Sequence, residues 1–222
     1  MNKKKLRRLI EEGESSTVEF KRKLTDSKKI AKELCAFANT RGGILIVGVD
    51  DDKTICGVMS EKSEANLIRT ACDFDLQPPI TPTIYNFNIM GFELVVAEIE
   101  ESNNKPINLL SQNENNQTLK RAYIRVGEKS VMASSEMARA LRYLNKGVDS
   151  DGNGVSFTFG KNEKALFKYL DANERATVND FAKLVNISRR RAERLMIRML
   201  RAGVLQIHQD SAHDYFTAVW VK

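Results

Sequence analysis

The chain has 222 residues, of which 42% are hydrophobic, and a formal net charge of +6 at pH 7. This length and hydrophobic fraction predict one large or two small folded domains and exclude a disordered chain. No apolar run of about 18 residues is present, so a transmembrane helix is not expected. The N-terminus lacks the pattern of a signal peptide, and the three cysteines form no CxxC pair. We therefore expect buried thiols in a cytoplasmic protein without a membrane partner.

Residues 1–146 alternate helical and strand patterns, which predicts a mixed first domain in an α+β protein. The expected helices cover 3–12, 27–39, 62–74 and 134–146, and the expected strands cover 17–21, 43–49, 55–58, 83–88, 92–100 and 120–126. Glycine, serine and aspartate cluster in 147–160, which predicts a flexible linker. A second domain, 161–222, should contain three helices (161–172, one from 177, and 188–203) and then two strands, 204–208 and 215–221.

Four motifs of the first domain carry a resemblance. Glu19-Phe20-Lys21 is followed by Ala36–Gly43, then by Val47–Asp51, and later by Tyr123–Gly127. In this order and spacing the motifs resemble the Schlafen AlbA_2 domain family, over roughly residues 11–144. Bacterial members with a winged helix behind this domain are described as transcriptional regulators, and many carry an ATP-binding label. Animal relatives include ribonucleases that use three acids.

Carried onto this chain, the ribonuclease resemblance implies Glu14, Glu19 and Asp50 as the catalytic acids, with Asp51 as a substitute. Three converging carboxylates could hold Mg²⁺ or Mn²⁺ and activate water for phosphodiester attack. Lys21 shares the face of Glu19 on a strand and could neutralise the scissile phosphate. The alternative is structural: Glu19 pairs with Lys21, and the two aspartates form a turn.

The turn Thr40–Gly43 separates a predicted helix from a buried strand, and it offers two interpretations. Asn39, Thr40, Gly42 and Gly43, together with Arg125, could bind a nucleotide phosphate; alternatively, Gly42 ends the helix and Arg125 braces a sheet edge. ATP hydrolysis is not expected, because the chain contains neither GxxxxGK[ST] nor GxGxxG.

The third helix of the second domain holds the charge imbalance. Residues 175–203 contain eight basic and two acidic side chains, a net charge of +6 that equals the net charge of the whole chain. Ser188 and Arg189 begin this helix, and five arginines then fall within about 100° of one another on the helical wheel: Arg190, Arg191, Arg194, Arg198 and Arg201. Guanidinium groups suit phosphates and guanine edges, so this face predicts contact with nucleic acid. The alternative is a solvated face on a module that binds protein.

Three helices followed by a hairpin resemble the winged helix-turn-helix family, whose third helix enters the major groove. The resemblance covers about sixty residues and implies a DNA partner, with RNA left open, and a homodimer on two half-sites. Our first expectation is therefore a DNA-binding transcriptional regulator without enzymatic activity. A metal-dependent nuclease, a nucleotide-binding sensor and a protein-assembly module remain as alternatives.

Overall fold

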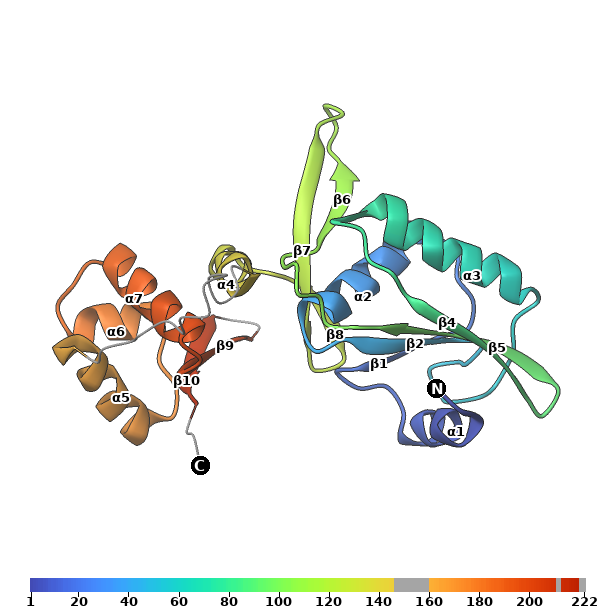
Figure 1. Cartoon of the computed structure of the whole chain (residues 1–222), viewed down its shortest axis with the longest axis horizontal. Helices are drawn as coiled ribbons and strands as arrows, with labels where there is room; N and C mark the ends of the chain where they lie inside the picture. The colour runs from blue at the N-terminus through green and yellow to red at the C-terminus, as the bar shows by residue number, and fades with distance from the viewer. Residues whose placement is uncertain (146–159, 211–212, 220–222) are drawn as a thin grey trace, which may run out of the picture. The chain divides into compact units, whose positions relative to one another are not determined.

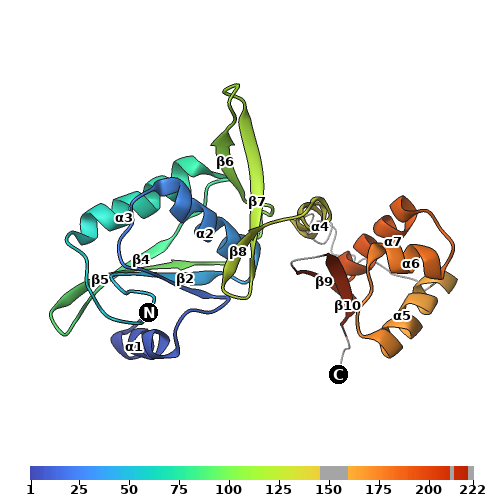
Figure 2. The ribbon, with the colours of Figure 1, turned by 180° about the vertical axis from the view of Figure 1, so that it is seen from behind.

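The computed structural model describes residues 1–145, 160–210 and 213–219. The chain divides into two compact units, Met1–Met132 and Ala133–Lys222, each with its own core (Figures 1 and 2). Within the described ranges, no helix combines the length and apolar character needed to cross a bilayer.

The first unit is built on a four-stranded sheet in the order β1-β2-β5-β4, in which β1 and β2 are parallel and the other pairs are antiparallel. Its elements are α1 (Lys3–Glu12), β1 (Val18–Lys21), α2 (Ser27–Asn39), β2 (Gly43–Val47), α3 (Glu61–Thr70), β4 (Thr83–Ile89) and β5 (Phe92–Ile99).

Helices cover both faces of this sheet. Helix α1 packs on one face against Phe20 and Ile46, whereas α2 and α3 pack on the other face against Leu45 and Val47 (Figure 1). Side chains alternate between the faces of a strand, and Phe20 points toward α1. Glu19 and Lys21 therefore share the face covered by α2.

A second sheet, in the order β3-β6-β7-β8, completes the first unit. Its strands are β3 (Leu76–Gln77), β6 (Asn108–Gln112), β7 (Thr118–Val126) and β8 (Lys129–Met132). Of these, only β7 was expected from the sequence. The strand expected at 55–58 is reduced to a single bridge between Val49 and Ile55, and α3 continues as a π-helical turn, η1 (Ala71–Asp75).

The second unit contains α4 and then the three helices and the hairpin that the sequence predicts. Its elements are α4 (Ser135–Asn145), α5 (Lys161–Asn173), α6 (Val178–Leu184), α7 (Arg189–Arg201), β9 (Leu205–Gln209) and β10 (Asp214–Ala218). A capping box between Thr177 and Asp180 begins α6. Phe181, Met196 and Phe216 lie in the core that joins the helices to the hairpin.

Helix α4 lies in the second unit, whereas the sequence pattern predicts it at the end of a first domain that reaches residue 146. Its side chains Met137, Ala140 and Leu141 are buried, and Arg139 forms an ion pair with Glu193 of α7. The structural division therefore falls between residues 132 and 133. The linker expected at 147–160 lies, except for Gly160, outside the described residues.

Candidate functional site

Helix α7 presents an exposed arginine face. Ser188 caps the helix by accepting a hydrogen bond from the backbone N–H of Arg191. The opposite side of the helix carries an apolar stripe, which includes Met196 and Met199 and is buried in the core of the second unit. Among the exposed arginines of α7, the side chains of Arg190, Arg191, Arg194 and Arg201 have no ion-pair or hydrogen-bond partner in the described part of the chain. Four positive charges on neighbouring turns attract a polyanion.

Two arginines of α7 have acidic partners inside the second unit. Arg198 donates to the buried carboxylate of Glu163 on α5 at 2.9 Å, and Arg189 forms an ion pair with Glu136 on α4. The sequence predicted a binding role for both, but these contacts anchor them to neighbouring helices. The part of the predicted face without acidic partners is therefore smaller than the whole, and the role of Arg189 and Arg198 in binding stays a prediction. This part retains Arg190, Arg191, Arg194 and Arg201, which we call the arginine face.

The first unit contains a buried ionic network centred on Arg125 of β7. Its side chain is 0% exposed, and its Nη1 lies 3.0 Å from Glu19 Oε2 and 3.1 Å from Glu33 Oε2. Nη2 donates to the backbone oxygen of Ser15 at 2.8 Å, and the guanidinium carbon lies 4.9 Å from the ring centroid of Phe37. A guanidinium enclosed in this way braces the two sheets, and it is not available to a phosphate.

Glu19 has a second cationic partner, since its other carboxylate oxygen contacts the ammonium group of Lys21. Lys21 also donates to the backbone oxygen of Phe20 at 2.9 Å. These contacts support the structural alternative, in which Glu19 pairs with Lys21. Asp50 and Asp51 lie in a turn that the backbone N–H of Lys53 closes by donating to the Asp50 oxygen at 2.8 Å.

The three acids expected to bind a metal ion do not converge. Glu14 Oε1 accepts the backbone N–H of Phe20 at 2.8 Å, and Asp50 Oδ2 lies 3.4 Å from a guanidinium nitrogen of Arg22. Over the described ranges, no group of three or more His, Cys, Asp or Glu side chains is arranged to hold a metal ion. Glu14, Glu19 and Asp50 each have another partner in this structure, and their predicted role as metal ligands stays a prediction.

Glu14 nevertheless lies in an acidic environment. Burial raises the pKa of its carboxyl group, the hydrogen bond from Phe20 lowers it, and the charge of Glu19 raises it again. Lys21 lowers this pKa and Asp51 raises it. Asp51, proposed as the substitute acid, therefore lies near enough to Glu14 for its charge to affect the pKa of Glu14.

The turn expected to bind phosphate has structural partners instead. Asn39 is buried, and its amide donates to the backbone oxygens of Ile107 at 2.8 Å and Tyr123 at 2.9 Å. Thr40 Oγ1 accepts the backbone N–H of Arg125 at 3.0 Å. These bonds fasten α2 to the second sheet.

The two glycines of this turn allow close packing. Gly42 has φ +71°, and a Cβ atom on it would lie 2.6 Å from a backbone oxygen of β5. A Cβ atom on Gly43 would lie 2.2 Å from the ring of Phe37. Neither position has room for a side chain, which is the structural interpretation of this turn, and its phosphate-binding role stays a prediction.

Sequence reasoning missed two members of the Arg125 network, Glu33 and Ser130. The hydroxyl of Ser130 contacts Glu33, and Arg125 Nη1 lies 3.2 Å from Ser130 Oγ. A signal for Glu33 exists in the sequence, since it lies between Ile30 and Phe37 on the apolar stripe of α2. An acid in such a stripe requires a buried partner.

Comparison with known proteins gives a family for the first unit. No curated protein matches the chain. Among solved structures, the DIP2311 protein from Corynebacterium diphtheriae has 20% sequence identity and a TM-score of 0.42, over 68% of this chain and 31% of that protein, so this chain spans less than a third of its length. The N-terminal domain of a protein related to the ATP-dependent DNA helicase RecG, from Nitrosomonas europaea, has 23% sequence identity and a TM-score of 0.41. The match covers 59% of this chain and 90% of that domain. The family model for Schlafen AlbA_2 matches residues 14–134, more than half of the 222 residues, and the chain therefore belongs to the Schlafen AlbA_2 family.

Proposed function

We propose that the protein is a DNA-binding transcriptional regulator that contacts DNA through the arginine face of α7. The observation that carries this proposal is the exposure of Arg190, Arg191, Arg194 and Arg201 without acidic partners in the described residues. Arginine forks donate in pairs to phosphates and to guanine edges, and a helix is narrow enough for the major groove.

The surrounding elements support a winged helix-turn-helix role for α5–β10. Helix α6 precedes α7 by a short turn, and the antiparallel hairpin β9–β10 follows it, in the position of a wing. The contacts of Glu163 with Arg198 and of Glu136 with Arg189 hold α7 against its neighbours. Membership in the Schlafen AlbA_2 family agrees with a function connected with nucleic acids.

The test is the salt dependence of DNA binding by the full chain and by the double variant Arg190→Ala/Arg194→Ala. Each lost phosphate contact flattens the plot of log K against log salt by about 0.9, so the double variant should lose up to about two units of slope. The control is Lys3→Ala/Lys4→Ala, which removes the same charge from exposed positions on α1. An unchanged slope in the arginine variant would refute the assignment of this face.

We further propose a homodimer, because one short helix contacts few base pairs and two-fold symmetry doubles the contacts. Light scattering on the protein with and without a palindromic duplex measures this directly. A complex of one chain with one duplex at saturation would contradict the dimer, but it would not contradict the assignment of the arginine face as the DNA contact.

The metal-dependent nuclease is the second candidate, and the proximity of Glu14 to Glu19 and Asp51 is the observation in its favour. The carboxylates as arranged do not fit a metal ion, since Glu19 is held by Arg125 and Lys21. Incubation of labelled DNA and RNA with Mn²⁺ decides between the candidates. Cleavage that Glu19→Gln abolishes at unchanged binding would place the nuclease first, and intact strands would support the regulator.

A further inference from the structure

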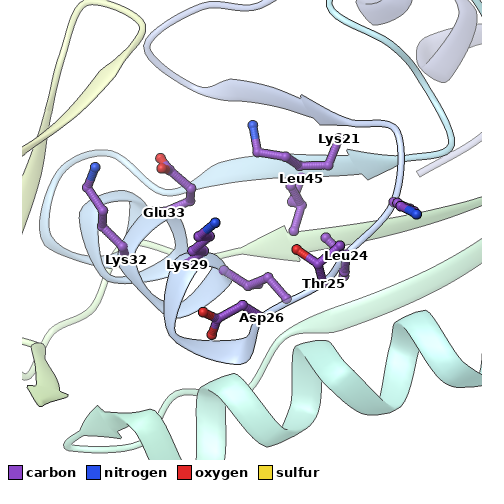
Figure 3. Close-up of a pocket in the computed structure, with 10 residues that line it drawn as sticks. Lys21, Leu24, Thr25, Asp26, Lys29, Lys32, Glu33 and Leu45 are labelled. Carbon is purple, nitrogen blue, oxygen red and sulfur yellow. The ribbon is translucent and has the colours of Figure 1, made fainter.

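A basic pocket of about 360 Å³ opens in the first unit beside the end of β1 and the first turns of α2. Figure 3 shows Lys29 and Lys32 on α2 and Lys21 on the neighbouring strand around one opening, with Leu45 directed from β2 toward the helix. The DNA contact proposed for α7 involves neither this pocket nor its lysines.

The acidic side chains that line the pocket or contact its lysines offset only part of the pocket's positive charge. Lys21 contacts Glu19, and the lining acid Glu33 is held by Arg125 and Ser130. The remaining lysines that line the pocket are Lys23, Lys29 and Lys32.

None of these three lysines has an acidic partner in the parts of the chain that the structure describes. Lys23 and Lys29 are exposed, and Lys32 lies 5.7 Å from the ring centroid of Tyr123. Asp26 is the lining carboxylate that can offset the charge of these lysines. One of its oxygens caps α2 by accepting a hydrogen bond from the backbone N–H of Lys28 at 2.8 Å. Three ammonium groups against one carboxylate favour an anionic ligand.

The interior of the pocket is not polar. Leu24, Ile30 and Leu45 line it, and the last two are buried side chains of the core. Its volume falls in the range of small-molecule sites, which combine an apolar wall with a few polar groups. A bare phosphate would use the lysines and leave this apolar wall unfilled.

Asp26 and Thr25 narrow the choice of ligand further, because both line the same pocket and offer hydrogen-bond acceptors. A ligand that is anionic over its whole surface would be repelled by Asp26. A nucleotide combines a phosphate for the lysines, a flat ring for the apolar wall, and hydroxyl or amino donors for the acceptors. We infer that this pocket binds a nucleotide through its phosphate, as a free mononucleotide or as the phosphorylated end of a nucleic-acid strand.

Calorimetric titration of the full chain tests the inference, with adenosine 5′-monophosphate, a 5′-phosphorylated tetranucleotide, the same tetranucleotide with a 5′-hydroxyl, and inorganic phosphate as probes. We expect one site per chain for at least one of the first two probes, and much weaker binding of the last two. Lys23→Ala/Lys29→Ala should weaken binding about tenfold or more, since it removes two charge-assisted contacts. Both side chains are exposed, so the fold should survive the change.

The control Lys3→Ala/Lys4→Ala removes equal charge elsewhere on the first unit and should bind as the wild type does. Binding only of the phosphorylated tetranucleotide would support the pocket and identify a strand end as its source. Absence of binding by both phosphorylated probes, equal binding of inorganic phosphate, or an unaffected Lys23→Ala/Lys29→Ala variant would each overturn the inference. Arg190→Ala/Arg194→Ala should retain nucleotide binding, so failure of the arginine face and failure of the pocket are distinguishable.

Discussion

Replacement of Arg125 by Met should destabilise the first unit by about 3 kcal/mol, at the lower end of the range for removing one partner of a buried ion pair. The guanidinium is 0% exposed and contacts two carboxylates at 3.0 and 3.1 Å, so its loss leaves both without their shared cation. The lower end of the range applies because Glu19 retains Lys21, Glu33 retains Ser130, and both acids keep some solvent contact, at 9% and 16% exposure.

The measurement is hydrogen exchange across a urea titration, read by mass spectrometry on peptides of each unit, because two units need not unfold in one transition. Arg125→Met/Glu33→Gln supplies the internal check, since it also removes one of the uncompensated charges and should recover part of the lost stability. A loss below about 1 kcal/mol, or a double variant no more stable than the single one, would refute the structural role assigned to Arg125.

Three further predictions concern single side chains. Glu14→Gln should raise the melting temperature at neutral pH. The pKa of Glu14 is raised in the folded state, so its ionisation destabilises the folded protein as the pH rises from the ordinary pKa through the raised one. The gain from Glu14→Gln should therefore vanish at acid pH, where Glu14 is protonated. Burial raises the pKa of Cys35 and of Cys72 to about 12, so iodoacetamide should label only the partly exposed Cys56 in the native protein. Gly42→Ala should lower the melting temperature, because it combines φ +71° with a contact of 2.6 Å to a backbone oxygen of β5.

A control variant or a contradicting outcome checks each of these predictions. Gly127 also has a positive φ, +58°, but a Cβ atom added there would meet no atom within 4 Å, so Gly127→Ala should lower the melting temperature less than Gly42→Ala does. Equal losses would mean that the contact at Gly42 is unimportant. Labelling of all three cysteines in the native state would show that the core opens on the time scale of the reaction, and a Glu14→Gln gain that persists at acid pH would exclude the ionisation of Glu14 as its cause.

The sequence predicted the elements whose patterns are long and periodic. Helices α5, α6 and α7 follow from their caps and apolar stripes, and the central strand β2 follows from its continuous apolar run. The second sheet was mostly missed. Strand β6 is polar at Asn108, Ser111 and Gln112, and its stability depends on pairing with β7, which no local pattern reveals.

Site prediction was limited for the same reason. Periodicity correctly placed Glu19 and Lys21 on one face of β1, but it could not place Arg125, 106 residues from Glu19, against that face. The arginines of α7 were found because they share one helix, whereas the acids that pair with Arg189 and Arg198 lie on α4 and α5. Residue types show which chemistry is available, and long-range contacts decide which charges remain free.

The assignment of α4 to the second unit has a consequence for how these parts can be recombined. A gene fusion that joined only residues from 161 onward to another protein would carry α7 without α4. Arg189 would then lack its partner Glu136, and Glu193 would lack its partner Arg139. The fusion would also strip from the unit the buried side chains Met137, Ala140 and Leu141. The transferable unit therefore begins at residue 133, and grafts or chimeras that start at that position should keep α7 together with its partners on α4.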